Sequence, residues 1–141
     1  MHVYLSDLHL DSPEHPHFRT LARVLENESS HAHGIYLLGD ICEVWVGDDD
    51  DGPLASALRD LLTRITAACP VYLMHGNRDF LFGQQFARDT GCRLLDDPHQ
   101  VNESVLLSHG DALCIDDTEY QKVRKLFRSS TWQQDILARS L

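Results

Sequence analysis

The sequence has little positive charge. Its 12 lysine and arginine residues face 22 aspartate and glutamate residues, which gives a formal net charge of −10. General nucleic-acid binding needs a basic face, so we expect no nucleic-acid partner. We expect bound cations to neutralise part of the acidity.

Closely spaced cysteines are also missing. The four cysteines, Cys42, Cys69, Cys92 and Cys114, form no C-x-x-C pair, which argues against a zinc-finger or redox motif. Two disulfides remain an alternative, but no signal peptide is recognisable. We therefore expect reduced thiols in a cytoplasmic protein.

Long apolar runs and repeats are absent as well. No run approaches the ~20 apolar residues that a membrane-spanning helix needs, and there is no internal repeat, low-complexity tract or linker. With 43% apolar and 24% charged residues, the composition is that of a soluble globular protein. The 141 residues are enough for one domain, 1–141, with a real core.

The most informative stretch that is present runs from Gly34 to Asp40, with the sequence GIYLLGD. Four apolar residues between glycines predict a short buried strand. A buried carboxylate is costly unless it is paired or binds a metal, and Gly39 allows a sharp turn before it. We therefore expect Asp40 at the edge of a sheet, where α/β proteins place their sites.

The same pattern, an apolar run that ends in polar residues, occurs three more times. The other runs are Val3-Tyr4-Leu5 before Ser-Asp-Leu-His, Val71-Tyr72-Leu73-Met74 before His-Gly-Asn-Arg-Asp, and Val105-Leu106-Leu107 before Ser-His-Gly-Asp. If the four strands share a sheet, their polar ends converge on one edge.

Strands and helices alternate along the chain, which predicts an α/β fold. We expect strands at 2–6, 35–38, 71–74, 92–95, 99–102 and 104–108. We expect helices at 16–28, 54–65 and 82–90, one that starts at Asp117 or Thr118, and one from Thr131 to the end. The close spacing of the last three strands predicts that part of the sheet is antiparallel or mixed. The acidic run 48–51 is expected to be a solvated loop, with site orientation or an outer cation contact as the alternative.

The polar strand ends carry metal-binding side chains. On an extended strand end Asp7 and His9 point the same way, so both can reach one ion. Asp40 has two oxygens and can bridge two ions, and Asn77 and His109 add an amide oxygen and an imidazole. Oxygen and nitrogen ligands without thiolate suit Mn, Fe, Zn or Mg.

Two ions about 3.5–4 Å apart can clamp the attacking and leaving oxygens of a phosphoryl displacement. They also lower the pKa of a bridging water and supply hydroxide near neutral pH. Arg78, beside Asn77, has the planar charged fork that suits phosphate oxygens. This chemistry needs no nucleophilic side chain.

Four motifs in order resemble the calcineurin-like metallophosphoesterase signature, namely SDLHL at 6–10, GD at 39–40, GNRD at 76–79 and HGD at 109–111. The flanks EVWVGDD at 43–49, HGNRDF at 75–80 and HGDALCIDD at 109–117 resemble the UDP-2,3-diacylglucosamine hydrolase family more closely. Most metallophosphoesterases have histidine after the motif asparagine, and Arg78 in its place is typical of this subfamily.

The resemblance implies a calcineurin-like αββα sandwich and a manganese-dependent pyrophosphatase of lipid A synthesis. Such an enzyme uses a bridging hydroxide to cut UDP-2,3-diacylglucosamine into UMP and 2,3-diacylglucosamine 1-phosphate, at the cytoplasmic face of the inner membrane as a peripheral protein. By the family pattern two Mn²⁺ ions are implied, one held by Asp7, His9 and Asp40, the other by Asp40, Asn77 and His109. Asn77, Arg78 and Asp117 are implied to contact substrate, with Arg78 as the catalytic side chain.

The family also has a later Gly-His-x-His motif and a helical insertion over the acyl chains, and neither lies in these 141 residues. We therefore expect the domain 1–141 to be incomplete at its C-terminus, with three protein ligands for each ion instead of four. Another dinuclear phosphodiesterase, or an inactive fragment, is the alternative function.

Several residues have simpler explanations. His75 is expected to pack under its loop, Asp117 to cap a helix with or without a substrate contact, and Arg78 to be open to an ion pair with Asp79. Asp79 and Asp111 are expected to orient ligands rather than bind metal. Tyr120, Val123 and Phe127 are expected in the core, as is Trp45.

Overall fold

A four-stranded parallel sheet forms the centre of the fold, with the strand order β1-β2-β3-β4. The structure, a computed structural model, describes residues 1–139. The sheet consists of β1 (His2–Leu5), β2 (Gly34–Leu38), β3 (Val71–Met74) and β4 (Arg93–Leu95). The strands β5 (His99–Asn102) and β6 (Val105–Leu107) form a separate antiparallel pair. The α/β prediction is thus confirmed.

The prediction of one partly antiparallel sheet is wrong, and the condition that all four polar-ended strands share a sheet is not met. The strand β4 pairs parallel to β3, and β6 lies in the second sheet with β5. Between β4 and β5 the chain passes through Asp96-Asp97-Pro98. Proline has no backbone N–H to donate to the hydrogen bonds between strands. The segment after β4 therefore leaves the first sheet.

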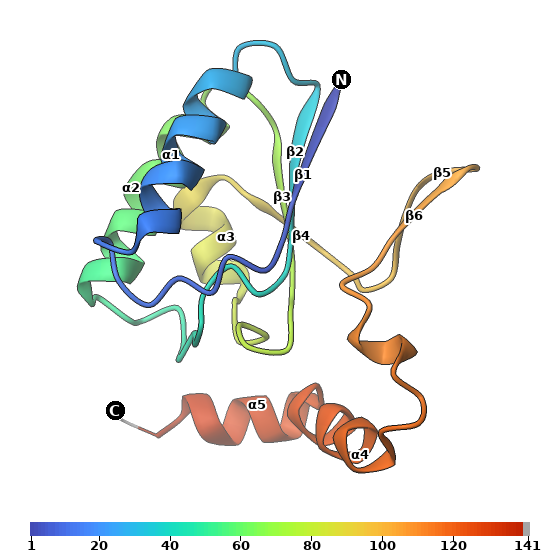
Figure 1. Cartoon of the computed structure of the whole chain (residues 1–141). Coiled ribbons are helices and arrows are strands. Elements are labelled where there is room, and N and C mark those ends of the chain that lie inside the picture. The colour runs from blue at the N-terminus through green and yellow to red at the C-terminus, as the bar shows by residue number, and fades with distance from the viewer. Residues whose placement is uncertain (140–141) are drawn as a thin grey trace.

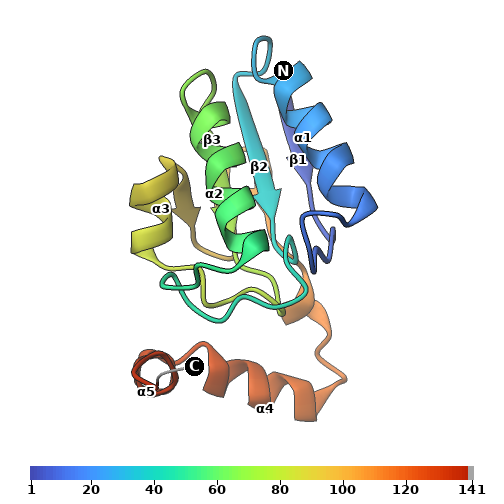
Figure 2. The ribbon, with the colours of Figure 1, turned by 90° about the vertical axis from the view of Figure 1, so that its left-hand side faces the viewer.

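Three helices cover one face of the parallel sheet (Figures 1 and 2). They are α1 (Pro16–Glu28), α2 (Pro53–Thr66) and α3 (Gln84–Thr90). The core lies between this layer and the sheet, where Leu25, Leu58 and Phe86 meet Ile35 and Leu37 of β2. All five side chains are at most 1% exposed.

The opposite face of the sheet carries the alternate residues of the same strands, as the two-residue period of a strand requires. The rings of Tyr4, Tyr36 and Tyr72 stack in a row across β1, β2 and β3, with centroid distances of 5.1 and 4.6 Å. Near the carboxyl end of the strands, Met74 packs with Leu107 of β6. The β5–β6 pair therefore touches only part of this face, and Tyr4 remains 43% exposed.

The helices α4 (Thr118–Phe127) and α5 (Ser130–Leu137) lie beyond the carboxyl edge of the sheet, toward which the β2 arrow points in Figure 2. A short 3-10 turn, η1 (Asp111–Leu113), precedes them. The expectation that Tyr120, Val123 and Phe127 are core residues is wrong, since Val123 is 42% exposed and the other two are half-buried. Phe127 stacks instead on Phe80, with a centroid distance of 5.5 Å.

The helix boundaries agree with prediction to within a few residues. The helix predicted at 82–90 begins at Gln84, because Phe82 packs in the core against Trp45 at 4.2 Å. It ends at Gly91 in the left-handed conformation, as expected. The last helix ends at Leu137 rather than at the end of the chain, and positions 140–141 lie outside the described residues.

The acidic run 48–51 is only partly a solvated loop. Both side-chain oxygens of Asp48 accept backbone N–H groups at the start of α3, from Gly83 at 2.9 Å and Phe86 at 2.8 Å. Asp48 also accepts from the indole of Trp45. The first aspartate of the run therefore fixes the start of a helix, while Asp49 and Asp51 are exposed as predicted.

None of the helices in residues 1–139 has the length and apolar character needed to cross a membrane.

Candidate metal centre

The five predicted ligands meet at the carboxyl edge of the parallel sheet. One ligand atom each from Asp7, Asp40 and His109 lies within 4.8 Å of the other two. Asp40 Oδ2 lies 3.8 Å from His9 Nε2 and 3.7 Å from His109 Nε2. Asn77 Oδ1 is 3.1 Å from His109 Nε2. The Asp40 carboxylate thus stands between two imidazoles, as a bridging ligand would.

Unusual backbone conformations hold three of these residues. Asp7, His9 and Asp40 have φ values of 56°, 50° and 51°, and they are the only non-glycine residues with positive φ in residues 1–139. Such residues cost about 1–3 kcal/mol each and gather at functional sites. The prediction that Asp7 and His9 converge through extended backbone is therefore wrong, although both side chains reach the cluster.

Hydrogen bonds between the loops secure this strained backbone. Asp7 N–H donates to Gly39 O at 3.1 Å, and His9 N–H donates to Asp40 O at 3.0 Å. Gly76 lies so close that an added Cβ would collide with the Asp40 side chain and backbone. Only glycine at position 76 lets the β2 and β3 loops approach this closely.

Asp79 is the buried anchor of the same loops. Its side chain is fully buried and accepts N–H groups from four residues, Asp40, Ile41, Cys42 and Gly76, at 2.7 to 3.3 Å. Burial raises the pKa of Asp79, and these hydrogen bonds act in the opposite direction. We therefore assign Asp79 to the support of the Asp40 and Gly76 loops, and it lies where the sequence predicted an orienting residue.

Both histidines of the cluster are held through Nδ1, which leaves Nε2 toward the carboxylate. His109 Nδ1 donates to Leu38 O at 2.9 Å, and His9 Nδ1 donates to Glu43 Oε2 at 2.8 Å. Metal-binding histidines typically use their second nitrogen in this way. With Nδ1 engaged by Leu38, Nε2 of His109 faces the Asn77 oxygen. Nitrogen and oxygen atoms that converge in this way fit a cation.

The donor set consists of carboxylate oxygens, imidazole nitrogens and an amide oxygen, with no thiolate. Such a set fits Mn, Fe, Zn or Mg better than a structural zinc site. The two carboxylates and the convergent lone pairs give a cation favourable electrostatics. The residues present therefore fit divalent metal.

The remaining predicted residues are placed differently. The Arg78 side chain is 49% exposed and pairs with Glu43 at 3.1 Å, so its ion-pair partner is Glu43 and not Asp79. Its backbone N–H donates to Asp40 Oδ1 at 2.9 Å.

Asp117 caps α4 by accepting Tyr120 N–H at 2.9 Å. Among the described residues we see no contact between Asp117 and the cluster. His75 packs under its loop as expected, donating from Nε2 to Phe82 O at 2.7 Å, and burial lowers its pKa.

Asp111 does not contact the ligands directly. It accepts from Tyr120 Oη at 2.5 Å and from Arg124 Nε at 2.8 Å. Burial alone would raise the pKa of Asp111, but these bonds outweigh it and lower the pKa. Burial and the bond to Asp111 together raise the pKa of Tyr120.

Two residues of the site had no role in the sequence-based prediction. Glu43 joins His9 to Arg78, and Asp97 accepts the His109 backbone N–H at 3.3 Å. The sequence could have indicated a role for Glu43, because this carboxylate lies only three residues after the predicted ligand Asp40. It contains no such indication for Asp97, which lies 12 residues before His109.

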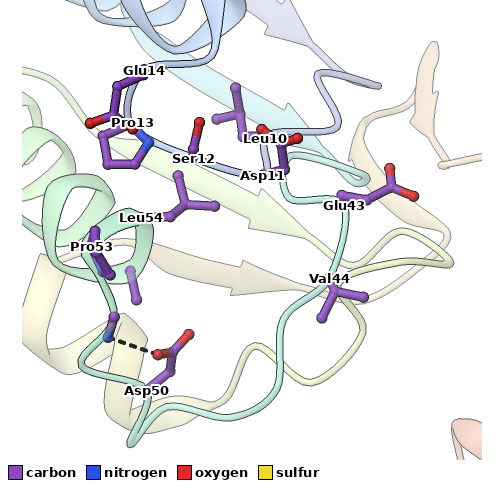
Figure 3. A pocket seen from close by; sticks show the side chains of 12 residues that line it. Leu10, Asp11, Ser12, Pro13, Glu14, Glu43, Val44, Asp50, Pro53 and Leu54 are labelled. Atoms are coloured by element: carbon purple, nitrogen blue, oxygen red, sulfur yellow. Dashed lines mark hydrogen bonds between the residues drawn. The ribbon is translucent and has the colours of Figure 1, made fainter.

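A groove of about 440 Å³ adjoins the cluster through Glu43. Figure 3 shows Pro13 and Leu54 along one part of it and Val44 along another. The side chains of Asp11 and Glu14 add negative charge to its lining. The groove therefore suits an uncharged or apolar group rather than a phosphate.

Comparison with known proteins agrees with this geometry. The sequence model of the Calcineurin-like phosphoesterase family matches residues 3–139. The chain is 46% identical over 140 residues to a UDP-2,3-diacylglucosamine hydrolase of Chromohalobacter salexigens, covering 96% of this chain and 57% of the relative. It is 43% identical to a protein of the same name from Chromobacterium violaceum, covering 98% of this chain and 60% of that relative. The chain thus spans somewhat more than half the length of these relatives, and it belongs to the calcineurin-like phosphoesterase family.

Proposed function

We propose that this chain carries the metal-binding half of a hydrolase that cleaves the pyrophosphate bond of UDP-2,3-diacylglucosamine in lipid A biosynthesis. The products would be UMP and 2,3-diacylglucosamine 1-phosphate. The observation that carries the proposal is the Asp40 carboxylate between the Nε2 atoms of His9 and His109. The names of the two relatives described above supply the substrate.

The proposed cofactor is Mn²⁺, with two ions per site. Asp7, His9 and Asp40 would hold one ion, and Asp40, Asn77 and His109 the other. When bound, such a pair supplies a water of low pKa as the nucleophile and neutralises charge on the phosphate oxygens.

The side chains of the chain itself divide the remaining work. Glu43 accepts the Nδ1 proton of His9 and so keeps Nε2 free for a ligand. Arg78, half-exposed and held by Glu43, is the proposed catalytic residue, because its fork can bind a phosphoryl oxygen in two-point fashion. Asn77 and Asp117 are the other proposed substrate contacts.

Since the proposed substrate carries two acyl chains, we also propose that the protein works at the cytoplasmic face of the inner membrane, as a peripheral protein. The apolar lining of the groove beside Glu43 is compatible with an uncharged part of such a substrate.

The test compares two substrates with Mn²⁺, UDP-2,3-diacylglucosamine and the generic diester bis(p-nitrophenyl) phosphate. The Chromohalobacter salexigens relative is the positive control, and Asp40→Asn is the variant, because it removes one charge with little change in shape. We expect hydrolysis of the UDP-lipid and its loss to background in Asp40→Asn. Cleavage of the diester alone would mean a different phosphodiesterase. No cleavage of either, while the relative turns over, would mean a fragment that binds metal without catalysis.

A further inference from the structure

Helix α4 reaches both loops that carry the predicted ligands of the second ion. Arg128 Nη2 donates to Gly76 O at 2.9 Å, directly before Asn77. Arg124 Nη2 donates to Asp97 Oδ2 at 3.3 Å. The other oxygen of Asp97 accepts from Ser108 Oγ at 2.7 Å and from the His109 N–H at 3.3 Å. Arg124 and Arg128, about one helical turn apart, thus fasten the His109 loop and the Asn77 loop to the same helix.

These contacts are not ordinary surface ion pairs. The Asp97 and Asp111 side chains are 4% and 7% exposed, and Arg124, which bonds to both, is 18% exposed. Exposed pairs contribute little, whereas a carboxylate removed from water needs its partner. The planar fork of Arg124 bonds to two carboxylates at once in a fixed geometry, which the flexible ammonium of lysine does not reproduce. Truncation of Arg124 therefore leaves the Asp97 turn without the group that orients it.

The predicted ligands of the first ion are supported from elsewhere. His9 is held by Glu43, which lies in the segment after β2 and also pairs with Arg78. Asp40 is shared by the two ions, and its loop rests on Asp79. Support for the two ion positions therefore comes from separate parts of the chain.

We propose that Arg124 and Arg128 are positioning residues for the ion held by Asp40, Asn77 and His109, and that α4 controls the occupancy of this position separately from the other. The inference rests on the metal centre of the proposed function, but not on the identity of the substrate. Outer partners of metal ligands typically change metal affinity by about 10–100-fold.

The experiment titrates Mn²⁺ into the 141-residue chain and into Arg124→Gln and Arg128→Gln, by calorimetry and by electron paramagnetic resonance. We expect wild type to bind two ions with a spin-coupled signal. Each variant should bind one ion with unchanged affinity and the other about 10–100-fold more weakly, with the signal of isolated Mn²⁺. The control is Arg64→Gln, which removes an arginine 60% exposed in a surface pair with Glu26 and should match wild type.

Double variants identify the affected position. Adding Asn77→Ala to Arg124→Gln should weaken only the ion that Arg124→Gln already weakens, because both changes act on one ion position. Adding His9→Ala should remove the remaining ion. Two ions of unchanged affinity in both arginine variants, or equal weakening of both ions, would overturn the inference.

Fold integrity is checked by circular dichroism, and Arg124→Lys provides a milder variant if Arg124→Gln is poorly folded. The lysine keeps the charge without the fork, so the second ion should still bind more weakly than in wild type, and wild-type affinity would count against the inference. Wild type that binds no Mn²⁺ would defeat both this inference and the proposed metal centre. Selective loss of one ion in a chain that does not hydrolyse the UDP-lipid would defeat the proposed hydrolysis by this chain and leave the inference standing.

Discussion

The two parts of the chain, residues 1–95 and residues 96–139, are stabilised in different ways. Among the described residues, every buried hydrophobic side chain except Leu107 precedes Arg93. The helices α4 and α5 contain no fully buried residue. The first part therefore holds itself together by apolar burial, and the second depends on contacts with the first.

Polar and aromatic contacts attach α4 and α5 to the first part, whereas Leu107 of β6 packs with Met74 in an apolar cluster. Arg128 bonds to Gly76 O, and Phe127 stacks on Phe80 and lies 4.5 Å from Trp132 between ring centroids. The metal cluster spans this junction, because His109 comes from the second part and the other four predicted ligands come from the first. The site is therefore assembled where a region with its own apolar core meets a region without one, so changes on the two sides should differ in kind.

The largest effect is expected from Asp79→Ala in the first part. The substitution leaves four buried backbone N–H groups without their acceptor, and unsatisfied buried donors cost about 1–3 kcal/mol each before relaxation. We expect the free energy of unfolding in urea to fall by about 4 kcal/mol, and Mn²⁺ binding to be lost.

The matched control is Asp60→Ala, an exposed aspartate on α2, which should change stability by less than about 0.5 kcal/mol. A loss below about 1 kcal/mol in Asp79→Ala would show that the loops do not depend on the buried carboxylate.

The next prediction compares the loss of stability on truncating one leucine from each part. Leu73 in β3 is 1% exposed and Leu106 in β6 is 64% exposed. Leu73→Ala should lower the free energy of unfolding by about 3 kcal/mol, whereas Leu106→Ala should stay within about 0.5 kcal/mol. Equal losses in urea unfolding would contradict the division of the chain into a self-supporting and a dependent part.

The first part was also the more predictable from sequence. The helix predicted at 16–28 matches α1 at both ends, and the strand at 71–74 matches β3. In the first part the residues with apolar periodicity are also the buried ones, so the elements predicted from periodicity match the observed helices and strands. In the second part Val123 and Phe127 have helical spacing but face no core, and periodicity alone does not tell a buried face from an exposed one.

The candidate site divides in a similar way. The predicted ligands were read from residue types at strand ends, and these do come together. Glu43 and Asp97 were missed because their roles depend on contacts across 34 and 12 residues of chain. The left-handed backbone of Asp7 and His9 was missed for a related reason, since only the approach of the β2 loop imposes it.

A smaller effect is expected from Phe127→Ala, which removes the stack on Phe80. Aromatic pairs contribute about 0.5–1.5 kcal/mol beyond burial, so we expect α4 to open more often while the sheet stays folded. A loss of about 1 kcal/mol makes the open state of α4 about 5-fold more populated, since 1.4 kcal/mol corresponds to about tenfold. Trypsin should therefore cut at Lys122 and Lys125 about 5-fold faster. Val123→Ala is the control, because Val123 is 42% exposed, and faster cleavage there too would remove the aromatic explanation.

The last prediction changes no residue of the fold and compares the reactivity of the cysteine thiols in the two parts. Cys42 and Cys92 in the first part are buried, and burial raises the pKa of both, that of Cys92 to about 11. Cys114 in the second part is exposed. Since the thiolate is the reactive form, iodoacetamide at pH 8 should label only Cys114 in the native chain, and all cysteines in urea. Mass spectrometry of tryptic peptides measures this, and Cys114→Ser should abolish native labelling. Rapid native labelling of Cys92 would mean that the first part opens as readily as the second, because only opening exposes that thiol.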